Sequence, residues 1–203
     1  MRWIVTAIAL LVSQAATVGA QEPAPTADEG SAASDTVVEA TARLTVGPFE
    51  FEPCAACTSS TFVMRAPEGP VQVLVVRGQD ADLGENAGHS FVAFSWYAQG
   101  VSDGADGSLS VEGVRDLVGD SIAASAGVAD RLAAAGTMTI GSTSVEAMAV
   151  TLGDGLTARV GAVAQSDGVL VVTSFVRASE PSVAGLTLML ETVTVSSASM
   201  DTL

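Results

Sequence analysis

The sequence predicts an α+β fold, an α/β sandwich in which an antiparallel meander of strands packs against one long helix. Several stretches rich in β-branched residues alternate with period two, which is typical of strands. One segment, after Ser110, changes to helical spacing. Glycine-containing turn signals separate the last strands, and such signals favour antiparallel hairpins.

The predicted strands lie on both sides of the helical segment. They are Val38–Glu52, Thr61–Arg65, Val71–Arg77, Ser90–Tyr97, 137–140, 145–152, 156–164 and 169–177. In the fourth of these, Val92, Phe94 and Trp96 share one face. Gly-Asp-Gly at 153–155 and Ser-Asp-Gly at 166–168 lie between the last three strands. The back half of the chain is therefore predicted to be an antiparallel meander.

The helix is predicted from apolar residues that recur at intervals of three and four. They are Val111, Val114, Leu117, Val118, Ile122, Ala126, Ala129 and Leu132. Ser108 or Ser110 is suited to cap its start, and Glu112 suits the first turn. Gly127 is predicted to break the helix before Leu132.

The closing segment admits two predictions. A helix that begins after Ser179, with Pro181 at its first position, fits the preference of proline for that place. The letters "LTLMLETVTV" at 186–195 also alternate, so a closing strand is the alternative.

The order of elements resembles the PsbP-like α/β-sandwich domains, including their small secreted bacterial members. The resemblance covers about Val37 to Val195 and is carried by "VEGVRDLVGDSIAAS" at 111–125, "TMTIGSTSVEAMAVTL" at 137–152 and "GLTARVGAVAQSDGVLVVTSFVRAS" at 155–179. In that family a helix is followed by a strand, a glycine near Gly141, and a hairpin leading to a final helix. The resemblance implies a non-catalytic binding or accessory module, and no catalytic residue carries over from it.

The N-terminus has the layout of a secretory signal peptide at residues 1–20. Arg2 precedes a short apolar run at 3–12, and small residues lead to a cut before Gln21. The apolar run is shorter than the ~20 residues that span a bilayer, so no membrane anchor is predicted after cleavage. The protein is therefore expected to be periplasmic or secreted.

The mature chain is predicted to have two parts. Residues 21–36 are rich in Pro, Ala, Ser and acid and have almost no large apolar side chain, which predicts a flexible linker. Residues 37–203 are enough for a single domain of ordinary size.

The charge balance argues against several classes of partner. The chain has 8 basic residues, all Arg, against 23 acidic ones, for a net charge of −15. Such a chain repels phosphate backbones and anionic membrane surfaces, so no nucleic-acid partner is expected. The expected partner is a protein or a small ligand, and no cofactor is predicted.

Cys54 and Cys57, the chain's only cysteines, form a Cys-x-x-Cys pair. Haem attachment requires His after the second Cys, where this chain has Thr58. A thioredoxin-like site places the pair at the head of a helix, whereas the residues that follow here indicate a strand. A structural disulfide that staples a turn between the first two strands is predicted. A thiol–disulfide oxidoreductase that uses the same pair is the alternative function.

Three short motifs suggest catalysis or metal binding, and each has a structural explanation. Gly-Asp-Ser-Ile at 119–122 resembles the opening block of the GDSL-type esterases but lies in the helical pattern. Gly-His-Ser at 88–90 lacks the strand-to-helix turn of a nucleophile elbow, so His89 is predicted to be a surface residue. "SDGADGSLSVEG" at 102–113 predicts a turn and a helix cap, with weak calcium binding through Asp103, Asp106 and Glu112 as the alternative.

Processing provides the first test. Because small residues stand at the −3 and −1 positions of the cut, we expect intact mass spectrometry of protein from the secretory compartment to give a chain that begins at Gln21. A mature protein that retains Met1–Ala20 would contradict the predicted location.

Overall fold

A computed structural model describes residues 34–36, 43–54, 57–66, 69–78, 90–98, 110–128, 132–152, 155–177, 180 and 182–195. The predicted signal peptide, most of the predicted linker, His89, Asp103 and Asp106 lie outside these ranges. The described chain is an α+β fold of antiparallel sheets and two helices, which confirms the predicted class.

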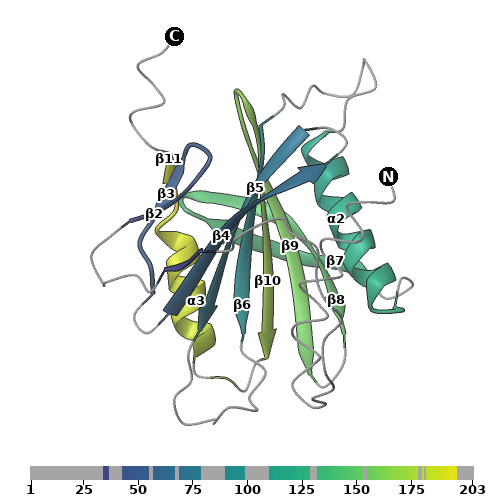
Figure 1. The fold of residues 1–203 in the computed structure, drawn as a ribbon. Coiled ribbons are helices and arrows are strands. Elements are labelled where there is room, and N and C mark those ends of the chain that lie inside the picture. Colours follow the sequence, from purple (N-terminus) through teal and green to yellow (C-terminus); the bar gives the residue numbers. More distant parts are fainter. Residues whose placement is uncertain are drawn as a thin grey trace, which may run out of the picture.

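The larger sheet of the described chain has eight antiparallel strands (Figure 1). In spatial order they are β1 (Ser34–Thr36), β4 (Cys57–Ala66), β5 (Gly69–Gly78), β6 (Phe91–Tyr97), β10 (Gly168–Arg177), β9 (Leu156–Gln165), β8 (Thr143–Thr151) and β7 (Ala133–Ile140). The last four form the predicted meander. β1 takes up the last three residues of the predicted linker, which pair with β4.

A smaller sheet covers β6. It consists of β11 (Thr194–Val195), β3 (Phe49–Phe51) and β2 (Leu44–Val46). The turn between β2 and β3 contains Gly47, whose φ is +54° and whose missing Cβ leaves room for the Trp96 indole. The Phe51 and Phe94 rings stack with centroids 4.4 Å apart. The described part of the stretch predicted as strand, residues 43–52, is thus a hairpin, because Gly47 and Pro48 reverse the chain inside the alternating pattern.

The helices cover opposite faces of the larger sheet (Figure 1). α2 (Val111–Ser125) packs mainly on β9, and the Ser110 hydroxyl caps it by accepting the Gly113 N–H at 3.1 Å. α3 (Ser182–Glu191) packs on β5 and β7. The helices have 15 and 10 residues, so α-structure is divided between the two faces and does not reside in one long helix. The closing segment is the predicted helix, α3, and the strand predicted as the alternative over 186–195 is limited to the two residues of β11.

Each face of the larger sheet carries its own apolar core. The core under α2 includes Val73, Phe91, Val171 and Phe175. The core on the other face includes Val92, Phe94 and Trp96, which share a face as predicted, and it is closed by α3 and the smaller sheet. The described part of the molecule therefore has three layers: α2, the larger sheet, and α3 with the smaller sheet.

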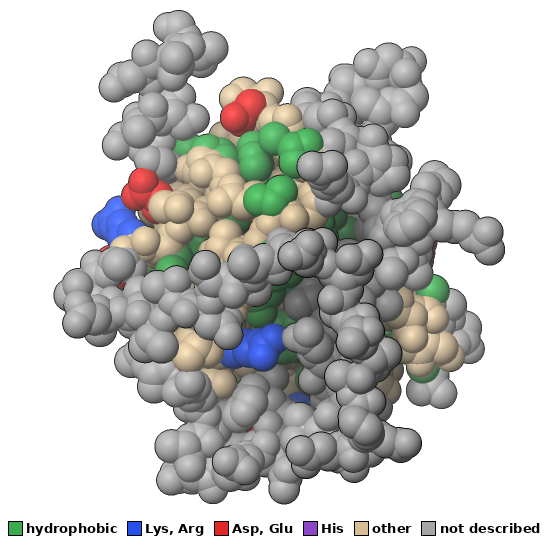
Figure 2. Space-filling model, viewed as in Figure 1, with side chains coloured by type: hydrophobic (Ala, Val, Ile, Leu, Met, Phe, Trp, Pro, Cys, Tyr) green, Lys and Arg blue, Asp and Glu red, His purple; other side chains and the backbone are tan. Residues whose placement is uncertain are grey.

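The cores leave few large apolar side chains at the surface. Among the described residues, Val63 and Leu188 are the large hydrophobic side chains that stand exposed. Figure 2 shows one face, on which hydrophobic side chains gather in the upper part and described charged side chains are few. The position of most apolar side chains is thus explained by the two cores.

The turn between β7 and β8 holds the C-terminal end of α3. The Gly141 N–H donates to the Leu190 carbonyl at 2.7 Å, which satisfies one of the carbonyls that a helix leaves open at its end. The φ of Gly141 is +58°, and a Cβ there would overlap the Val193 carbonyl oxygen. Only glycine meets both demands without rearrangement.

Substitution of two glycines separates backbone strain from this contact. Gly155→Ala meets no atom within 4 Å and should lose about 1 kcal/mol of unfolding free energy from its left-handed φ alone. Gly141→Ala should lose about 2 kcal/mol more, because the backbone overlap displaces the end of α3. Urea denaturation measures both, and equal losses would show that the contact with α3 carries no stability.

Candidate functional site

A pocket of about 330 Å³ lies between α3 and the larger sheet. Its apolar lining consists of Val92, Met138, Val176, Val183, Leu186 and Leu190. Its polar lining consists of Thr137, Thr139, Arg159, Ser174, Thr187 and Glu191. We call it the α3 pocket.

The space under α3 arises from the side chains along β10. Leu170, Val172 and Ser174 point to the same face, and the two apolar residues are fully buried in the core there. The next residue on this face is Ser174, whose side chain is much smaller than those of Leu170 and Val172. Ser174 lies opposite Val92 on β6 and opposite Arg159 on β9. The sheet register therefore sets a hydroxyl, an aliphatic group and a guanidinium side by side.

Arg159 reaches from β9 to the edge strand β7. The β7–β8 register shifts between Ala134 and Thr137, which is a β-bulge that takes carbonyls out of the ladder. Arg159 Nη2 donates to the Ala135 carbonyl at 3.1 Å and to the Thr137 carbonyl at 2.9 Å. These are its hydrogen bonds with described residues, and no carboxylate of a described residue lies within 4.0 Å of its nitrogens. Its Nε and Nη1 donors have no partner among the described residues.

A second pocket of about 390 Å³ adjoins the first. Its walls include Ile140, Thr143, Val163 and Val193, and Glu191 lines both pockets. Glu191 is exposed, so its carboxylate stands at the boundary between the pockets and solvent.

A buried polar network anchors the N-terminal end of α3. The Glu180 side chain is 5% exposed, and its Oε2 accepts the Ser90 N–H and the Ser90 hydroxyl, both at 2.6 Å. The Ser90 hydroxyl accepts the Arg177 N–H at 3.0 Å, and Arg177 Nε lies 3.9 Å from Glu180 Oε1. The network joins the start of β6, the end of β10 and the start of α3. The Ser90 hydroxyl is therefore a buried structural group just before β6.

The predicted disulfide is present. Cys54 and Cys57 are bonded with Cα atoms 5.5 Å apart, and the Cys57 N–H donates to the Cys54 carbonyl at 3.2 Å. Cys57 is the first residue of β4, so a strand and not a helix follows the pair. The staple joins β3 to β4, and Cys54 lies against Gly185 of α3.

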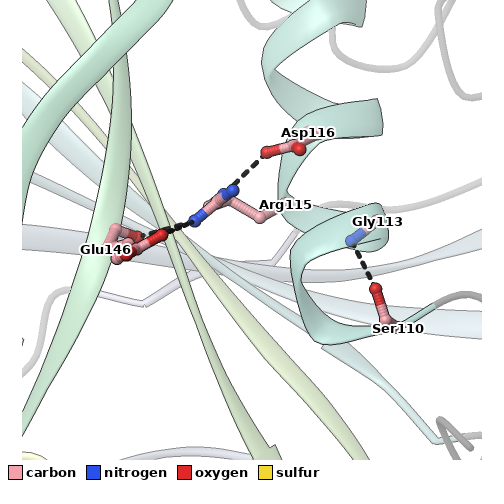
Figure 3. Close-up of polar contacts among 5 residues, drawn as sticks. All are labelled: Ser110, Gly113, Arg115, Asp116 and Glu146. Carbon is pink, nitrogen blue, oxygen red and sulfur yellow. Dashed lines mark hydrogen bonds and ion pairs between the residues drawn. The ribbon is translucent and has the colours of Figure 1, made fainter. Parts of the chain in front are cut away.

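A charged cluster ties α2 to β8 (Figure 3). Arg115 is 8% exposed, and its Nε lies 2.7 Å from Asp116 Oδ1. Its Nη1 lies 3.6 Å from Glu146 Oε2 and 3.4 Å from the Glu146 carbonyl. The hydrogen bond to Asp116, followed by its charge and that of Glu146, raises the pKa of Arg115 above its usual value against the opposing effect of burial. The cluster borders a hollow of about 250 Å³, but its cation already has carboxylate partners.

The remaining motifs are structural or lie outside the described residues. Ser121, from the esterase-like block, is buried inside α2 and donates to the Leu117 carbonyl at 2.8 Å. Glu112 is exposed on the first turn of α2, whereas its proposed calcium-binding partners Asp103 and Asp106 are not described. Within the described ranges, no three His, Cys, Asp or Glu residues come together as a metal site.

Sequence reasoning missed the α3 pocket, Arg159 and Glu180. In the sequence, Arg159 has the pattern of a solvent-facing residue of a strand. Its role depends on the bulge in β7, which lies two strands away in the sheet. The one local signal for Glu180 is an acidic residue directly before Pro181 at the predicted helix start.

Comparison with protein-family models, curated proteins and solved structures finds no match to this chain. None of the helices in the described ranges has the length and hydropathy required to cross a membrane.

The Glu180 network provides a stability test. Glu180→Ala leaves the Ser90 donors and the Arg177 guanidinium without their acceptor, so unfolding free energy should fall by about 3 kcal/mol. Glu191→Ala, at the exposed end of the same helix, should change it by less than about 0.5 kcal/mol. Similar values for both variants in urea denaturation would show that the network does not anchor α3.

Proposed function

We propose that this chain is a secreted or periplasmic, non-catalytic binding or accessory domain whose ligand site is the α3 pocket. The observation that carries the proposal is a preformed cavity with an aliphatic wall and a few convergent polar groups, among them the guanidinium of Arg159. This is the usual make-up of a small-molecule site.

The fold supports membership of the PsbP-like α/β sandwiches as part of this proposal. In that interpretation α2 is the long helix of the family pattern, and β7–β10 with α3 are the strands and final helix that follow it. The tight turn at Gly141 takes the place of the family glycine. A shared architecture does not define a ligand, so the pocket and not the fold carries the function.

The alternative is a thiol–disulfide oxidoreductase that uses Cys54 and Cys57. Such enzymes lower a thiol pKa with the N-terminus of a helix, whereas β4 begins at Cys57 here. Both cysteines are half-buried against the core under α3. These features favour a staple that supports the pocket.

The net charge of −15 supports a protein or small ligand and opposes nucleic acid. A small ligand fits the proposal better because the α3 pocket is a hollow between α3 and the sheet and not a flat surface. The location outside the cytoplasm follows from the predicted signal peptide and accords with the disulfide.

Native mass spectrometry tests the proposal. Protein purified without denaturation from the secretory compartment should carry a small molecule that organic extraction releases. Val183→Phe places a ring in the pocket and should reduce the bound fraction at least about tenfold, at a stability cost of about 1–3 kcal/mol.

The Cys54→Ser/Cys57→Ser double variant is the matched control. It should retain the bound molecule while folded, and thiol labelling of the unmodified protein should find no free Cys. Absence of a bound molecule, combined with turnover of a disulfide substrate, would overturn the proposal in favour of the oxidoreductase.

A further inference from the structure

We infer that the α3 pocket binds a small monoanionic amphipath, with its carboxylate on Arg159 and its short aliphatic chain against α3. This inference rests on the proposed function and specifies its ligand.

Arg159 differs in its charge balance from three other described arginines. Arg43, Arg115 and Arg177 each face a carboxylate within 4.0 Å. Arg159 is half-buried in a chain with a large excess of acid, yet it has no such partner among the described residues. The carbonyls of Ala135 and Thr137 satisfy Nη2 but do not balance its charge. A carboxylate in the pocket would supply the missing charge.

The geometry favours a carboxylate over a neutral polar group. Nε and Nη1 are the donors of Arg159 that described residues leave unused, and each can give a charge-assisted hydrogen bond to one oxygen of a carboxylate. The Ser174 hydroxyl lies beside Arg159 across the β9–β10 ladder and offers a further donor. An aliphatic alcohol has one oxygen and no charge, so it would not balance the guanidinium.

Glu191 limits the charge of the ligand. It is the other charged group that lines the pocket, and it does not lie within ion-pair distance of Arg159. Because Glu191 is exposed and Arg159 is half-buried, solvent and salt screen the carboxylate more than the cation. The pocket therefore favours one negative charge near Arg159 and disfavours a second near its mouth.

The apolar wall of the pocket determines the apolar part of the ligand and its length. Val183, Leu186 and Leu190 of α3 face Val92 of the sheet across the pocket. Its volume of about 330 Å³ is near the lower limit of the ~300–1,000 Å³ typical of ligand sites. The aliphatic chain of the ligand is thus expected to be short, in the range of medium-chain carboxylates. Each of its methylene groups should improve the affinity by about fourfold.

Isothermal titration calorimetry of the mature, delipidated chain tests the inference. The probes are octanoate, hexanoate, octan-1-ol, octylammonium and zwitterionic leucine. Octanoate should bind at least about tenfold tighter than octan-1-ol, as the loss of a charge-assisted pair predicts. Hexanoate should bind about fifteenfold more weakly than octanoate, and octylammonium and leucine should bind more weakly than octan-1-ol.

Variants test whether Arg159 causes the preference for octanoate over octan-1-ol. Arg159→Gln should bring the octanoate-to-octanol preference close to one, and Arg43→Gln, which removes the same charge from the smaller-sheet side, should leave it unchanged. If Arg159→Gln does not fold because the β7 bulge loses its donor, Ser174→Ala keeps Arg159 and should reduce the preference severalfold. An unchanged preference in both variants would overturn the assignment.

The probe series also separates this inference from the proposed function. Equal binding of octanoate and octan-1-ol, or tighter binding of octylammonium or leucine, would overturn the anionic ligand while the pocket remained a binding site. No binding of any probe, together with no molecule bound to the native protein, would overturn both.

Discussion

The burial of both faces of β10 is the constraint on which the rest of the structure depends. Every residue from Gly168 to Phe175 is buried, and the strand lies between β6 and β9 in the ladder. An antiparallel sheet can leave one face in water, but a strand whose side chains are buried on both faces cannot. Both α2 on one face and α3 with the smaller sheet on the other are therefore required. Arg115 and Glu180, the charged groups that join these layers, lie at the margins of the cores. Each has an oppositely charged partner there, which offsets the cost of its burial.

The α3 pocket is a consequence of the same arrangement. Where β10 fills the core on the α3 side of the sheet it uses Leu170 and Val172, and at the next position on that face it has Ser174. A hydroxyl at a position between two closely packed layers leaves volume that neighbouring side chains do not fill. Arg159, whose Nη2 donates to carbonyls at the β7 bulge, lines this volume with a positive charge that no carboxylate of a described residue balances. Packing demands and a local break in the ladder thus produce a polar site inside an apolar interface.

The sequence predicted what is encoded locally. Alternation located most strands, spacing located α2, and Ser110 and Gly127 marked its ends because capping and left-handed φ values depend on neighbouring residues alone. The smaller sheet was not separated from the stretch around Val38–Glu52, since its short strands alternate without interruption across the turn. The site could not be predicted, because it depends on which strands become neighbours and on which side α3 settles. Residues far apart in the chain, such as Ser90 and Glu180, show no pairing in a single sequence.

The anchoring of α3 determines how a ligand would reach the pocket. Glu180 fixes its N-terminal end, Cys54 of the disulfide lies against Gly185 in its first turn, and the Gly141 N–H donates to the carbonyl of Leu190 near its C-terminal end. A helix held at three places along 10 residues cannot lift without breaking a buried polar network or a packed core. The pocket is therefore preformed, and little ordering free energy opposes binding. Entry is left to the open side between β7 and the last turn of α3, where the exposed Thr139, Thr187 and Glu191 form the rim. A ligand that enters with its aliphatic tail first passes this polar rim and places the tail against the apolar wall. Its head group then remains within reach of Arg159.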